Sequence, residues 1–128
     1  MKKVMVFGTF DKIHLGHINL FEQAKKYGDY LIVVVARDQN VKKIKGHLPE
    51  RNEEQRLKEI KKENLVAKAV LGHPNNPYKV IADEKPDVIC LGYDQDSYDR
   101  YLKEIFPDIE ATRLKPYKPE IYKSSKLK

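Results

Sequence analysis

Cysteine is nearly absent from the sequence, which contains one such residue, Cys90, in 128 positions. A single cysteine excludes an intrachain disulfide and a zinc site built from several cysteine ligands. A chain without disulfides is typical of a reducing compartment, so the cytoplasm is the predicted location.

Long apolar runs are also absent. A membrane-spanning helix requires about 20 consecutive apolar residues, and no segment approaches that length. The N-terminal MKKVMVFG has two lysines before a short apolar patch, which is much shorter than the apolar core of a secretory signal. We interpret this patch as a β-strand, and we expect no membrane partner.

The composition indicates one globular domain with an affinity for anions. Apolar residues make up 41% and charged residues 34% of a chain whose length suits a single domain, predicted over 1–128. The 25 Lys and Arg residues exceed the 19 Asp and Glu residues, giving a net charge of +6. This balance favours nucleotides or phosphorylated metabolites as ligands. The alternative is a lysine-rich surface that serves only solubility.

Apolar runs alternate with amphipathic segments along the chain. Strands are predicted over 4–7, 30–36, 66–72, 86–92 and 109–114, helices over about 15–28, 52–63, 78–85 and 97–105, and a loop over 37–50. Strands that alternate with helices predict a doubly wound α/β fold, a Rossmann-like parallel sheet of about five strands. Its ligands bind beyond the carboxyl ends of the strands, where FGTFD, VARDQN and LGYDQ would meet.

The segment GTFDKIHLGH at positions 8–17 carries the strongest functional signal. Gly8 ends the first strand, and Gly16 lacks a side chain at a point where a phosphate could approach the backbone. A helix that begins near Leu15 or Gly16 would offer unpaired N–H groups to an anion. His14 and His17 would then donate hydrogen bonds to phosphate oxygens.

Two other interpretations of the histidine pair stay open. Either ring could be a satisfied structural residue, or the pair could bind zinc. H-x-x-H supplies only two zinc ligands, and the sequence gives no reason to place His47 or His73 beside it. We therefore predict no protein-held metal site.

GTFDKIHLGH resembles the G-T-F-D-x-x-H-x-G-H signature of the cytidylyltransferase-like nucleotidyltransferases. This family includes glycerol-3-phosphate cytidylyltransferases and archaeal-type FAD synthases. The resemblance extends through GDYLIVVVARD, VKKIKG, EEQR, PDVICLGYDQ and YKSSKL, and so covers essentially the whole chain.

The resemblance implies roles for residues of the signature. Thr9 and Phe10 would lie near the nucleotide phosphates, and His14 and His17 would stabilise the α-phosphate as it becomes five-coordinate. In-line transfer of this kind needs positioning and charge stabilisation without a covalent enzyme intermediate. Asp11 is expected to brace the turn.

The resemblance also implies roles for basic residues in the following segment. Lys43 and Lys45 match a lysine pair that touches substrate phosphates, with Lys42 as an alternative in a shifted register. Arg56 is similar to a family arginine near the active site, and its alternative is an exposed helix residue.

Residues of the C-terminal third complete the implied nucleotide site. Asp94 stands where relatives contact the nucleoside, and its alternative is a turn-forming residue. Arg113 and the pair Ser124 and Ser125 match the two ends of the cytidylyltransferase pattern R-T-E-G-I-S-T-T, but the segment between them is longer. The serines would hold β- and γ-phosphates at a helix start, or act as a plain N-cap.

The expected function is transfer of a nucleotidyl group from a nucleoside triphosphate to a phosphate-bearing acceptor, with release of pyrophosphate. Mg²⁺ is expected to accompany the triphosphate. The segments ARD and LGYDQ and the basic tail favour ATP and FMN over CTP and glycerol 3-phosphate. A non-catalytic nucleotide- or RNA-binding module is the alternative from another class, although no aromatic-rich RNA-binding signature is evident and a nucleic-acid partner is not expected. A homodimer stays open.

Overall fold

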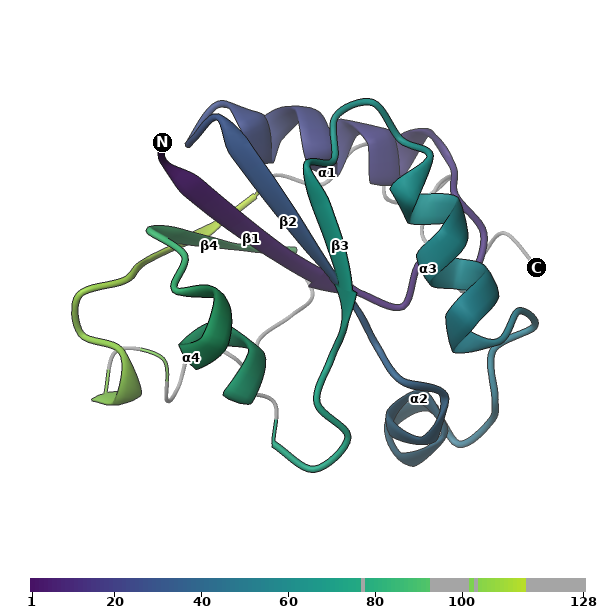
Figure 1. The fold of residues 1–128 in the computed structure, drawn as a ribbon. Coiled ribbons are helices and arrows are strands. Elements are labelled where there is room, and N and C mark those ends of the chain that lie inside the picture. Colours follow the sequence, from purple (N-terminus) through teal and green to yellow (C-terminus); the bar gives the residue numbers. More distant parts are fainter. Residues whose placement is uncertain (77, 93–101, 103, 115–128) are drawn as a thin grey trace.

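Five parallel strands form the central sheet of the computed structural model, which describes residues 1–76, 78–92, 102 and 104–114. They are β1 (Lys3–Gly8), β2 (Tyr30–Val35), β3 (Lys68–Leu71), β4 (Val88–Leu91) and β5 (Glu110–Arg113). Their order across the sheet is β3-β2-β1-β4-β5 (Figure 1). The predicted doubly wound sheet is therefore confirmed.

The central strands β1, β2 and β4 are buried on both faces, as their apolar composition predicts, whereas the edge strands β3 and β5 are partly exposed. In β1, Val4 packs into the cluster on one face and Met5 into the cluster on the other. In β2, Leu31 and Ile32 divide between the faces in the same way. This alternation follows from the two-residue period of a strand and leaves the functional groups to the strand ends.

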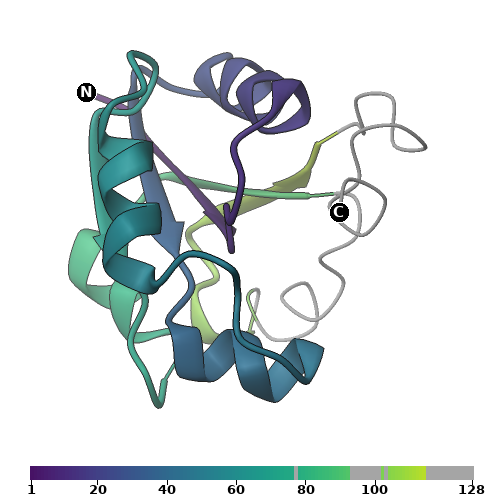
Figure 2. The same cartoon turned by 90° about the vertical axis from the view of Figure 1, so that its right-hand side faces the viewer.

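Helices cover both faces of the sheet. Phe21 of α1 (Leu15–Lys25) and Ile60 of α3 (Glu53–Lys61) pack on one face. Ile81 of α4 (Lys79–Glu84) packs on the other. Helix α2 (Asp38–Lys45) lies beyond the carboxyl end of β2 and leads through a loop into α3 (Figure 2). No helix among the described residues is long and apolar enough to cross a membrane.

The strand order reverses beside β1. The chain builds β1, β2 and β3 outward in one direction and then returns to place β4 and β5 on the opposite side of β1. A ligand crevice is expected beyond the carboxyl ends of the strands at such a reversal. The turn that follows β1, which carries the histidines, lies at this position.

The expectation of a loop over 37–50 is wrong, because α2 occupies Asp38–Lys45. Asp38 in the first turn and Lys45 in the last turn complement the helix dipole, and Gly46 ends the helix with φ of 82°. Val41 is its buried residue. Because Val41 and Ile44 are its only apolar residues, the signals at the two ends were the main evidence for this helix.

The other elements agree with the sequence prediction, apart from differences of one to three residues at their ends, and β1 extends one residue beyond each end of the strand predicted over 4–7. β3 and β4 each begin two residues later than the predicted strands over 66–72 and 86–92 and end one residue earlier. Asn52 caps α3 as expected, and its side chain accepts a hydrogen bond from the Gln55 amide. Most of the helix predicted over 97–105 lies outside the described residues.

Candidate active site

The turn between β1 and α1 is built around the buried ring of Phe10. Phe10 has φ of 53° and is 4% exposed, and its ring packs edge-on against His17 with centroids 5.2 Å apart. A Cβ atom on Gly8 would approach that ring to 2.6 Å. Gly8 is therefore needed to admit the ring of Phe10, which packs against His17. Because this side chain is buried, it supports the turn and is not a surface for a nucleotide.

The two histidines cap α1 reciprocally. His14 is the N-cap residue, and its Nδ1 accepts a hydrogen bond from the Gly16 amide at 3.0 Å. His17 Nδ1 accepts one from the His14 amide at 3.3 Å. Because an imidazole nitrogen that accepts a hydrogen bond carries no proton, the neutral rings hold their protons on Nε2. Each ring then has one donor, Nε2–H.

The expectation of unpaired amides at the start of α1 is wrong for two residues of its first turn. The Gly16 amide is bound to His14 Nδ1, and the His17 amide donates to the His14 carbonyl at 3.0 Å. The N-cap imidazole satisfies the helix end that an anion would otherwise occupy. Stabilisation of a phosphate therefore falls to the imidazole donors and neighbouring cations.

Burial keeps both imidazoles neutral. Desolvation is the main cause that lowers the pKa of His17 to about 3, the charges of His14 and Lys45 lower it further, and a hydrogen bond with the Lys12 backbone opposes them. Desolvation also lowers the pKa of His14. The two rings stack with centroids 3.9 Å apart, an arrangement that would be unfavourable for two imidazolium ions.

Acidification is expected to destabilise the fold through His17. Between its ordinary pKa of 6.5 and its folded value of about 3, the unfolded chain binds a proton that the folded chain does not. The free energy of unfolding should therefore fall with decreasing pH by up to about 1.4 kcal/mol per pH unit. Thermal unfolding measured from about pH 7 to about pH 4 should show a shallower decline for His17→Asn. Equal slopes for the two proteins would contradict the assignment.

Asp11 braces the turn, as predicted. Its carboxylate accepts hydrogen bonds from the Glu50 amide at 2.8 Å and the Arg51 amide at 2.9 Å. Lys12 forms an exposed ion pair with Glu50 at 2.7 Å. These contacts attach the histidine turn to the loop between α2 and α3.

The predicted lysines lie on α2 rather than in a loop. Lys42, Lys43 and Lys45 are all exposed. The Lys45 charge lowers the pKa of His17, so this lysine is within electrostatic reach of the histidine pair. The fold thus lets a lysine 28 positions away in the sequence act on the histidine through its charge.

Arg56 is buried, with no exposed side-chain surface, so the alternative of an exposed helix residue is wrong. Its guanidinium contacts Asp38, a residue to which the sequence analysis gave no role. The signal for Asp38 was its position in ARD, directly after the second strand. Glu53 was missed too, and it accepts hydrogen bonds from Arg37 Nη1 at 3.1 Å and from the Asp38 amide at 3.0 Å.

Arg113 lies at the carboxyl edge on the other side of β1. It ends β5, and its Nη1 donates to the carbonyl of Gly92, directly after β4, at 2.7 Å. The predicted contacts Asp94, Ser124 and Ser125 lie outside the described residues. Their roles stay predictions.

Cys90 takes no part in this site. It is buried in β4, and burial raises the pKa of its thiol to about 12. A protonated, enclosed thiol is neither a nucleophile nor a metal ligand.

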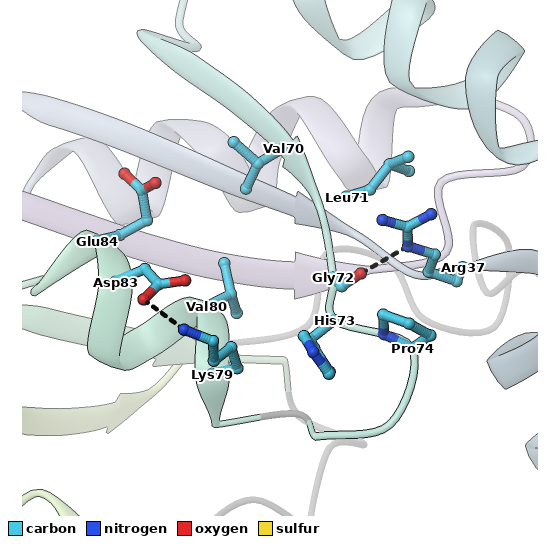
Figure 3. Close-up of a pocket in the computed structure, with 10 residues that line it drawn as sticks. All are labelled: Arg37, Val70, Leu71, Gly72, His73, Pro74, Lys79, Val80, Asp83 and Glu84. Carbon is cyan, nitrogen blue, oxygen red and sulfur yellow. Dashed lines mark hydrogen bonds and ion pairs between the residues drawn. The ribbon is translucent and has the colours of Figure 1, made fainter.

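A separate pocket of about 230 Å³ lies between the end of β3 and α4 (Figure 3). None of the described residues that line it belongs to the predicted site. Arg37 Nε already donates to the Gly72 carbonyl at 2.8 Å, and Lys79 pairs with Asp83 at 3.1 Å. Since these cations are engaged, the pocket is a poor anion site, and the histidine turn remains the candidate.

Comparisons with known proteins show the family to which the chain belongs. The cytidylyltransferase-like family model matches residues 5–126. FAD synthase of Ferroglobus placidus is 50% identical over 105 residues, which cover 81% of this chain and 67% of that protein. FAD synthase of Thermoplasma acidophilum is 40% identical over 132 residues, covering 100% of this chain and 92% of that protein.

Solved structures show the same fold. A protein from Thermoplasma volcanium, described as a lipopolysaccharide core biosynthesis protein, is similar with a TM-score of 0.86 and 38% identity, over 91% of this chain and 98% of that one. A protein with unknown function from Archaeoglobus fulgidus has a TM-score of 0.66 and 21% identity over 90% of each chain, and this likeness concerns the fold alone.

Proposed function

We propose, from the premise that this chain belongs to the cytidylyltransferase-like family and is a nucleotidyltransferase, that it transfers the adenylyl group of ATP to FMN, forming FAD and releasing pyrophosphate. The observation that carries this proposal is the pair of neutral imidazoles that cap α1, with Lys45 in electrostatic reach. FAD synthases of this family at 40–50% identity support ATP and FMN as the substrates.

The transfer would be a single in-line displacement. An oxygen of the FMN phosphate attacks the α-phosphorus of ATP, the bond to the bridging oxygen breaks, and that oxygen leaves with pyrophosphate. Charge gathers on the α-phosphate oxygens, where the Nε2–H groups of His14 and His17 would donate hydrogen bonds. Since both Nδ1 atoms are engaged in capping, the rings serve as fixed donors rather than as nucleophiles.

Mg²⁺ would enter this site with the triphosphate. No group of three His, Cys, Asp or Glu side chains that could hold a metal occurs in the described part of the chain. The donors at the site are imidazole N–H groups and a lysine, which suit anions. A magnesium ion would accordingly be held by phosphate oxygens and water, and would neutralise charge on the leaving pyrophosphate.

The surface around Lys45 fits an aromatic acceptor better than a small polyol phosphate. Ile44 is 84% exposed and Leu48 is 57% exposed, and they flank Lys45 in the sequence. Exposed apolar side chains beside a phosphate-binding lysine could cover the flavin ring while the lysine meets its phosphate. Glycerol 3-phosphate has no apolar surface to use them.

Replacing Ile44 by serine is therefore expected to raise the KM for FMN by about 5- to 10-fold, the effect of losing roughly 1 kcal/mol or more of apolar contact. The KM for ATP should change little. Steady-state kinetics with each substrate varied would measure both constants. Tyr27→Ser, at an exposed apolar position beyond the far end of α1, is the matched control and should leave both unchanged. An equal rise in the two KM values would argue against the flavin contact.

The decisive test of the proposed function measures pyrophosphate with each pair of triphosphate and acceptor. Release with ATP and FMN, together with FAD as product, supports the proposal. Dependence on CTP and glycerol 3-phosphate would favour a cytidylyltransferase. No release with any pair, despite nucleotide binding, would favour a non-catalytic module.

A further inference from the structure

We infer that Arg56 is a positioning residue that joins the lysine helix α2 to the histidine turn, so that Lys45 and His17 face the two phosphate groups that react with each other. The inference rests on the proposed function, because it assigns the role of Arg56 within that reaction. It concerns a side chain that cannot itself meet a substrate.

The guanidinium of Arg56 has three partners from three segments. Its Nη1 donates to the Thr9 carbonyl at 2.7 Å, its Nη2 to Asp38 Oδ1 at 2.6 Å, and its Nε to the Arg51 carbonyl at 3.0 Å. The side chain has no exposed surface. A buried guanidinium whose three nitrogens each have an acceptor holds those acceptors in place and has no nitrogen directed toward a substrate.

Each partner belongs to a segment that carries or supports a candidate functional group. Thr9 begins the turn that leads to His14 and His17. Asp38 lies in the first turn of α2, the helix that ends with Lys45. The two phosphate-binding groups thus arise from different segments, and a single guanidinium contacts both segments.

The third partner closes the arrangement. The Arg51 carbonyl accepts from Arg56, while the Arg51 amide donates to Asp11 at 2.9 Å. Asp11 belongs to the histidine turn, so this turn is attached to Arg56 through Thr9 and again through Arg51. Glu53 holds the start of α2 independently, since its carboxylate accepts a hydrogen bond from the Asp38 amide.

An arginine is required for this geometry. A lysine ammonium would keep the charge, but it is a point donor on a flexible stem and could not direct bonds to three separated acceptors. Buried ion pairs contribute little to net stability when compared with apolar replacements. Placement of reacting groups, by contrast, is sensitive to shifts of about 1 Å, which can lower a rate about 100-fold.

The test uses the full chain with Asp38→Asn and Arg56→Met combined. Arg56→Met alone would leave the Asp38 carboxylate without its partner and could unfold the protein, whereas the double variant leaves no uncompensated charge. We expect the double variant to unfold at a higher temperature than Asp38→Asn, in which the buried guanidinium has lost its ionic partner. It should lose about 100-fold in kcat and show a much smaller change in the KM for ATP. Arg56→Lys should also lose most of kcat. Lys58→Met, an exposed basic position on the same helix, is the matched control and should behave like the wild type.

Two further measurements separate positioning from general stability. Lys45→Ala should lower kcat/KM much less in the double variant than in the wild type, because the double variant has already lost the placement of Lys45 relative to His17. The ¹⁵N signals of the His14 and His17 rings should show the Nε2–H form in the wild type and a mixture of tautomers in the double variant.

The possible outcomes decide between the proposals. Loss of kcat in a folded double variant, with a reduced Lys45→Ala effect, supports the positioning role. Wild-type turnover in that variant, or loss of activity only together with loss of the fold, would overturn it. If the wild-type protein itself releases no pyrophosphate, the proposed function fails. The ¹⁵N signals of the histidines alone then decide whether Arg56 holds the histidine turn in its conformation.

Discussion

His17→Ala is expected to lower turnover at least about 100-fold while the protein stays folded, the loss that follows removal of one transition-state donor. His17 is a suitable donor because Phe10 packs against its ring and its Nδ1 accepts the His14 amide, so its Nε2–H has a fixed direction. The pKa of about 3 keeps the ring neutral, and its donor strength should not depend on pH in the neutral range. Single-turnover measurement of FAD or pyrophosphate formation would give the rate.

His17→Asn separates the two roles of this ring. The asparagine oxygen can take the place of Nδ1 and accept the His14 amide, so the cap at the start of α1 is retained, but nothing replaces Nε2–H. We expect a loss of turnover close to that of His17→Ala with a higher unfolding temperature. His47→Ala, an exposed histidine outside the turn, is the control and should keep full activity. Full turnover in His17→Asn would show that capping, not donation, is the function of the ring.

The sequence was sufficient to predict the sheet because apolar runs such as YLIVVV permit little except a strand buried on both faces. It was sufficient to place the histidine turn because Gly8, Gly16 and the histidines occur in one short segment. It was insufficient for α2, because this short helix has only two apolar residues, Val41 and Ile44, and only Val41 is buried. Sequence patterns therefore predicted those parts of the site that consist of residues close together in the sequence.

The contacts between segments could not be predicted in this way. Arg56 stands 47 residues from Thr9 and 18 from Asp38, and its helix is otherwise amphipathic and highly charged. Nothing in its neighbours distinguishes it from an exposed arginine. The capping role of the histidines was equally hidden, because Ser, Thr, Asp or Asn usually occupies an N-cap, and an imidazole there suggested a ligand first.

Lys45→Ala is expected to lower kcat/KM by about 10- to 100-fold, because it removes a charge-assisted hydrogen bond to phosphate worth roughly 1.5–3 kcal/mol. Lys45 is selected over its neighbours because its charge acts on His17. Lys42→Ala provides the matched comparison, since it removes an equal charge from the same exposed helix and should have an effect of less than about 3-fold. Steady-state kinetics at low and high salt would measure both effects, and the difference in kcat/KM between the wild type and Lys45→Ala should shrink as salt rises.

A larger loss for Lys42→Ala would assign the phosphate contact to the other register. A different face of α2 would then be directed toward the substrate. Lys43→Ala completes the series, because the sequence pairs Lys43 with Lys45 whereas positions two apart on a helix do not face the same direction. A strong effect at both positions would mean that they meet different groups, one on the triphosphate and one on the acceptor.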